Sequence, residues 1–113
     1  INLFSEKSKE KFNPEIQLAL SEALQTSLQG YSACQEGMRI RPNRLSVLKN
    51  NHFKKLFILG KKDPVLPVKK GIKEAEETQS ETVVLSGGHM SHIENSGKLI
   101  KVLNTFIRRS LSY

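Results

Sequence analysis

The sequence contains one cysteine and no tryptophan, and aromatic residues make up only 6% of its 113 residues. A single thiol, Cys34, cannot form an internal disulfide, which fits a reducing compartment, so we expect a cytoplasmic protein. No apolar run approaches the roughly 20 residues that a membrane-spanning helix needs. No basic head followed by an apolar stretch marks a secretion signal. We therefore expect no membrane partner.

Acidic residues are almost missing from one long stretch. Between Arg39 and Lys73 there are eleven lysines and arginines against the single acid Asp63, and the whole chain carries a net charge of +7. A basic block of this kind can bind nucleic acid. However, no aromatic side chains for base stacking lie between the lysines, and lysines beside an apolar strand commonly keep it soluble. We expect a solvated basic face and no nucleic-acid partner.

At 113 residues the chain is at most one ordinary domain. Helical spacing of apolar residues predicts a first helix that starts at Asn13 and Pro14 and ends at Gly30. A second short helix is expected over residues 31–38. Asn43 can cap a third helix that runs through residues 44–49.

From residue 54 the pattern changes. KKLFILG (54–60) and ETVVLSGG (81–88) read as buried strands, with a helix from Pro67 to about Thr78 between them and an amphipathic helix over 99–107 after them. The order strand, helix, strand, helix implies an α/β fold with two parallel strands and a right-handed crossover. Continuous apolar strands need helices on both faces and further strands beside them. The pair is therefore expected to be the edge of a larger sheet.

Each of these strands is followed by a polar side chain. Asp63 comes three residues after Gly60, and His89 comes directly after Gly87 and Gly88. Carboxyl ends of parallel neighbours share one edge of a sheet, so we expect the acid and the histidine to meet there. An aspartate bound to one imidazole nitrogen fixes the tautomer and stabilises the imidazolium. Histidine suits a proton-transfer role because its ordinary pKa is about 6.5.

The segments LFILGKKDPVLP and VVLSGGHMSHIEN resemble the last two strands of the α/β-hydrolase fold. In that family the acid of a Ser-Asp-His triad lies in a G-x-x-D loop, matched here by Gly60 and Asp63. The catalytic histidine follows the next strand as G-H, matched by Gly88 and His89. The resemblance implies that Asp63 and His89 are catalytic residues of a serine-type hydrolase, with no cofactor and with a small acyl substrate, most simply an ester.

The resemblance runs from about Phe12, most strongly from Lys54, and it also implies a division of the chain. Residues 1–42 would be a helical cap segment, and residues 43–113 the C-terminal part of the hydrolase core. The chain departs from the family at Ser96 and Gly97, where a proline often opens the last helix.

The family's nucleophile elbow, G-x-S-x-G, is absent. The nearest segment is GYSAC around Ser32, which we reject because the residues before it read as a helix and Cys34 replaces the last glycine. The chain is therefore expected to be a C-terminal fragment that is inactive alone. Its expected partner is the N-terminal remainder of the same protein, carrying the serine and the oxyanion hole. Self-association through the open strand is also possible.

Other readings of the same residues stay open. His89, His92, Glu94 and Asp63 are possible zinc ligands, but H-x-x-H in a loop is not the helical H-E-x-x-H pattern, so no metal is expected. We expect His92 to be structural and Glu94 to serve the start of the last helix. The Asp–His pair also suits cleavage of carbon–carbon, epoxide or amide bonds. A different class is a non-catalytic basic module that binds nucleic acid or an acidic partner.

Overall fold

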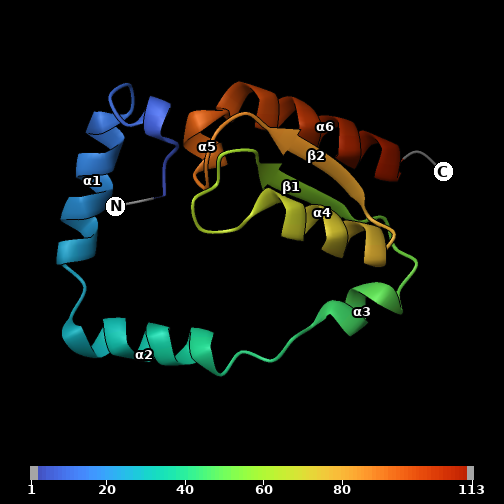
Figure 1. The fold of residues 1–113 in the computed structure, drawn as a ribbon, viewed down its shortest axis with the longest axis horizontal. Coiled ribbons are helices and arrows are strands. Elements are labelled where there is room, and N and C mark those ends of the chain that lie inside the picture. The colour runs from blue at the N-terminus through green and yellow to red at the C-terminus, as the bar shows by residue number, and fades with distance from the viewer. Residues whose placement is uncertain (1–2, 112–113) are drawn as a thin grey trace.

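The computed structural model describes residues 3–111, which form a helix-rich α/β structure around one small parallel sheet (Figure 1). The elements in chain order are a 3-10 helix η1 (Glu6–Ser8), α1 (Asn13–Leu24), α2 (Leu28–Arg39), α3 (Leu45–Lys49), β1 (Leu56–Gly60), α4 (Val68–Glu77), β2 (Glu81–Leu85), α5 (Ser91–Glu94) and α6 (Ser96–Leu111).

The two strands pair in parallel along their whole length. Leu56 lies opposite Glu81 at one end, and Gly60 lies opposite Leu85 at the other. Helix α4 connects them, and α6 follows β2. The predicted order of strand, helix, strand and helix is confirmed, and so is the general α/β class.

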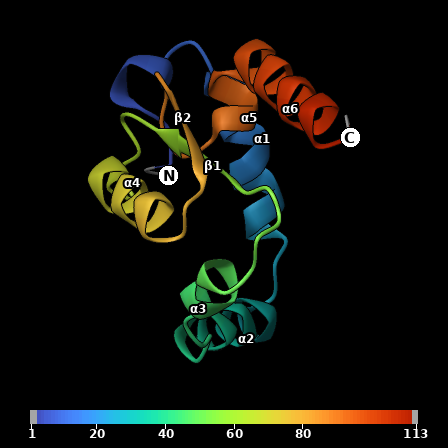
Figure 2. The same ribbon diagram turned by 90° about the vertical axis from the view of Figure 1, so that its right-hand side faces the viewer.

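The sheet lies between two helices. Figures 1 and 2 show α4 on one face of the strands and α6 on the other. Helix α4 approaches closely because of Gly71: a β-carbon there would lie 2.5 Å from Cδ2 of Leu59. On the opposite face, Val102 and Phe106 of α6 border a hollow that Leu56 and Val83 also line. A helix thus lies on each face of the strands, as apolar parallel strands require, while Val84 of β2 remains 43% exposed.

Helices α1 and α2 lead away from the sheet, and α3 returns to it, where Lys49 pairs with Glu77 of α4 at 2.8 Å (Figures 1 and 2). The predicted single helix ending at Gly30 is wrong, because α1 ends at Leu24 and a new helix begins at Leu28. The hydroxyl of Ser27 accepts a hydrogen bond from the Gly30 N–H at 3.1 Å. Serine is a strong N-cap, so Gly30 lies in the first turn of α2 instead of ending α1.

The buried core is small. Among residues 3–111, the buried apolar side chains are Phe4, Ala75 and Leu85. Phe4 is 2% exposed, and its ring centroid lies 6.4 Å from that of Phe12. The N-terminal residues that the sequence assigned to a cap segment therefore contribute to the core beside the strands.

Candidate functional site

The carboxyl ends of the two strands are held together by backbone hydrogen bonds. The N–H of Lys61 donates to the Leu85 carbonyl at 2.7 Å, and the N–H of Lys62 donates to the Gly87 carbonyl at 2.9 Å. No glycine among residues 3–111 has a positive φ, so the glycines of this loop do not serve a left-handed turn. They are needed for space: a β-carbon on Gly88 would lie 2.6 Å from the Ser5 nitrogen.

Asp63 lies in the loop between β1 and α4, where the chain holds its carboxylate from both sides. Oδ1 accepts the N–H groups of Val65 and Leu66 at 2.8 and 2.9 Å, and Oδ2 lies 2.8 Å from Nδ1 of His89. The carboxylate is only 8% exposed. Burial pushes the pKa of Asp63 up, but the hydrogen bonds from Leu66, His89 and Val65 outweigh it and hold this pKa below its ordinary value. Asp63 is therefore ionised at neutral pH.

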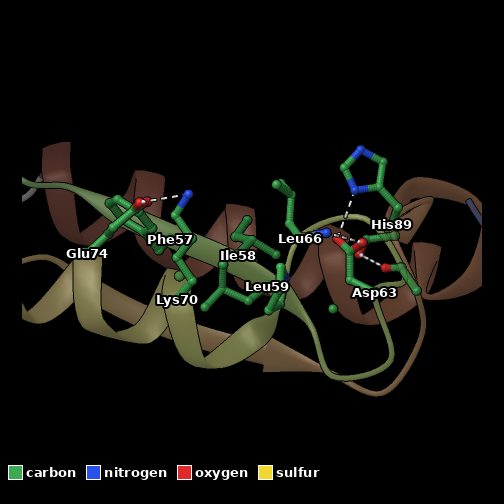
Figure 3. A pocket seen from close by; sticks show the side chains of 13 residues that line it. Phe57, Ile58, Leu59, Asp63, Leu66, Lys70, Glu74 and His89 are labelled. Carbon is green, nitrogen blue, oxygen red and sulfur yellow. Dashed lines mark hydrogen bonds and ion pairs between the residues drawn. The ribbon is translucent and has the colours of Figure 1, made fainter. Parts of the chain in front are cut away.

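His89 follows β2 and faces Asp63, as expected from the topology. An ionised carboxylate only accepts hydrogen bonds, so the neutral ring carries its proton on Nδ1 and leaves the lone pair on Nε2. Figure 3 shows Nε2 pointing away from Asp63, on the outer side of the ring. The side chain is 35% exposed. A group brought to this side can give its proton to Nε2, which is the arrangement of a general base.

A cavity of about 260 Å³ lies beside this pair. Its apolar wall comes from β1 and the following loop, Lys70 and Glu74 of α4 line one end, and Asp63 and His89 line the other end (Figure 3). Apolar lining with a few polar groups is typical of small-molecule sites.

Glu94 has a different role from the one predicted. It was expected to serve the start of the last helix, but its carboxylate binds Ser5 and Gly88 instead. Oε1 accepts the N–H and the hydroxyl of Ser5 at 2.9 and 2.8 Å, and Oε2 accepts the Gly88 N–H at 2.8 Å. Ser5 lies 89 positions from Glu94, so no local pattern in the sequence could indicate this contact.

The other residues singled out in the sequence lie outside this pair. His92 is exposed in α5. Ser32 and Cys34 lie within α2, which confirms that the segment around Ser32 is a helix and not a strand-to-helix elbow. Cys34 is exposed. Within residues 3–111, no group of three or more His, Cys, Asp or Glu side chains is arranged to hold a metal ion.

Comparisons add no family to this description. No protein-family model matches the chain, and a search of curated proteins finds no match. In the part of the chain that the structure describes, no helix has both the length and the apolar character needed to cross a bilayer.

Proposed function

We propose that this chain supplies the acid and the histidine of a serine-type α/β hydrolase, whose nucleophile lies on another part of the enzyme. The observation that carries the proposal is the hydrogen bond of 2.8 Å between Nδ1 of His89 and Oδ2 of Asp63, at the carboxyl ends of two parallel strands. The G-x-x-D and G-H motifs at those two positions support the same assignment.

In the proposed reaction, Nε2 of His89 removes the proton from a serine hydroxyl as the oxygen attacks the acyl carbon. The imidazolium then gives that proton to the leaving group, and an alcohol departs from an ester. Asp63 remains ionised throughout and stabilises the positive ring. In the second half of the reaction, water takes the place of the serine hydroxyl: it gives a proton to His89 and attacks the acyl-serine. The carboxylic acid product leaves, and the serine hydroxyl is restored. Backbone N–H groups outside this chain would hold the oxyanion.

The cavity supports an acyl substrate. Its wall includes Phe57, Leu59 and Leu66, and His89 lies at one end. We propose a small ester as the substrate, with an apolar acyl part.

The outer edge of β1 supports the proposed second part of the enzyme. The Glu81 N–H donates to the Lys55 carbonyl and the Lys61 N–H to the Leu85 carbonyl, so odd-numbered residues of β1 face β2. The peptide groups of Ile58 therefore point to the opposite edge. A strand from the second part would pair there and extend the sheet.

The test is to isolate the chain from its natural source under gentle conditions and to measure the mass of every polypeptide. A fluorophosphonate, which reacts with activated serines, is then added. The proposal predicts a second polypeptide that is labelled at one serine in the wild type and not in a His89→Ala variant. A monomeric chain that binds a polyanion with steep salt dependence would instead support a basic interaction module.

A further inference from the structure

Glu94 joins three separate segments of the chain. Its carboxylate accepts the N–H and hydroxyl of Ser5 from the N-terminal segment, and the Gly88 N–H from the loop after β2. Ser8 also donates a side-chain hydrogen bond to it. The carboxylate itself belongs to α5, at the entrance to α6. One side chain thus fixes the N-terminal segment to the loop that carries His89.

The N-terminal segment reaches His89 by a second route. The N–H of His89 donates to the Leu3 carbonyl at 2.9 Å. Ser5 is 4% exposed and Phe4 is 2% exposed, so this segment is packed into the structure. The fit is tight around Gly88, where a β-carbon would lie 2.9 Å from Oε2 of Glu94 and 3.0 Å from the Leu3 oxygen.

The charge of Glu94 suits this position. Burial raises the pKa of its carboxyl, but hydrogen bonds from Ser5, Ser8 and Gly88 outweigh it and hold the pKa below its ordinary value. Hydrogen bonds to a charged acceptor are stronger than those between neutral groups. A glutamine could accept on one side only, because its amide nitrogen would face an N–H donor.

We propose that Glu94 is the positioning residue of His89: by binding Ser5 and Gly88 together, it holds the histidine loop and docks residues 3–8 against it, so that Nδ1 stays on Asp63. The inference rests on the proposed function for its catalytic meaning. Glu94 does not itself reach the His89 ring, so it acts through the backbone of Gly88 and His89.

The test uses the 15N-labelled chain and the ring nitrogens of His89, which report the tautomer by NMR. The wild type is expected to show the Nδ1–H tautomer bound to Asp63. Glu94→Ala should move both ring signals toward those of an Asp63→Asn variant, in which this pairing is lost. It should also speed hydrogen exchange of the Gly88 and His89 amides by about tenfold or more. The ring signals and the amide exchange rates of Glu94→Gln should lie between those of the wild type and those of Glu94→Ala.

Two further variants keep the test decisive. Ser5→Ala changes little volume, keeps the bond from the Ser5 N–H to Glu94, and removes the hydroxyl bonds to Glu94 and Ser8, so it should give a smaller shift in the same direction. Glu76→Ala, at an exposed position on α4, should leave the His89 ring signals and both amides unchanged. Protection of the β2 amides from hydrogen exchange shows whether each variant is still folded as a whole.

Wild-type ring signals in Glu94→Ala would overturn the proposal, as would a change in Glu76→Ala of equal size. The readout is independent of hydrolysis. If no serine is labelled in the complete protein but the His89 signals shift as expected, the hydrolase function fails while the positioning role of Glu94 stands.

Discussion

Gly60 and Gly88 touch backbone to backbone at the carboxyl ends of β1 and β2. A β-carbon on Gly60 would lie 2.2 Å from the Gly88 carbonyl oxygen and 3.0 Å from that of Gly87. No other residue type fits there without moving one strand end. This contact sets the spacing of the two loops that bring Asp63 within 2.8 Å of His89.

Gly60→Ala should therefore separate the two loops. We expect a loss of about 1–3 kcal/mol in the free energy of unfolding, as for other overpacked sites. We also expect the ring nitrogens of His89 to lose the signature of the Asp63 bond. Urea unfolding and NMR of the 113-residue chain measure both. The matched control is Gly97→Ala in α6, where a β-carbon meets nothing within 4 Å and stability should not fall.

Asp63→Asn tests the acid of the proposed triad in the complete enzyme. An asparagine cannot stabilise the imidazolium, and its amide nitrogen can pair with the wrong tautomer of His89. We expect kcat for ester hydrolysis to fall by about 10⁴. Glu77→Gln, which removes an exposed carboxylate paired with Lys49, should leave kcat within about twofold. Activity of the Asp63→Asn enzyme within tenfold of wild type would rule out the catalytic assignment of Asp63.

The part of this site that the sequence predicts is the part that depends on topology. An apolar run between lysines and Gly60 locates the first strand, and a β-branched run closed by two glycines locates the second. Parallel pairing then brings Asp63 and His89 to one edge. This inference needs only the apolar character of the two segments and the rule that the carboxyl ends of neighbouring parallel strands lie at the same edge of the sheet.

What the sequence does not predict depends on contacts between distant residues or on competing local signals. Ser5 and Glu94 are 89 positions apart, and nothing in either segment points to the other. Between Leu24 and Gly30 two local signals compete: glycine often ends a helix, and serine often starts one. The cap that Ser27 provides prevails, so Gly30 lies in the first turn of α2. The short helix α5 was missed because its four residues are too few to show a period.

The carboxyl groups of Asp63 and Glu94 should make folding depend on acid pH. Both pKa values are lowered from their ordinary values of 3.8 and 4.5 by the hydrogen bonds described above. A carboxyl with a lower pKa in the folded chain stabilises it above the unfolded pKa, and this stabilisation is lost as the pH falls through the folded value. Stability should therefore decline below about pH 4.5 and further below about pH 3.8.

Urea midpoints between about pH 6 and about pH 3 check this dependence. Glu94→Gln cannot ionise at this position, so its curve should lie below the wild type at the upper end and converge with it at the lower end. Asp63→Asn should converge with the wild type in the same way. Parallel curves for wild type and variants over this range would show that neither carboxyl contributes.

Gln79, in the turn between α4 and β2, offers a stability test remote from the site. Its φ of 51° lies in the left-handed region, which costs a residue with a β-carbon roughly 1–2 kcal/mol. The turn has the hydrogen bonds of a Schellman motif: the Gln79 N–H donates to the Glu76 carbonyl and the Ser80 N–H to the Ala75 carbonyl, at 3.1 and 2.9 Å. Glycine is the usual residue at this position.

Gln79→Gly should thus raise the free energy of unfolding by about 0.5–1 kcal/mol, because the relief of strain exceeds the greater flexibility of glycine in the unfolded chain. Gln79→Ala keeps the β-carbon and should give no gain, which separates the backbone effect from loss of the amide side chain. Urea unfolding of the three proteins at neutral pH measures the difference. Equal midpoints for the glycine and alanine variants would contradict a strained left-handed conformation at this position.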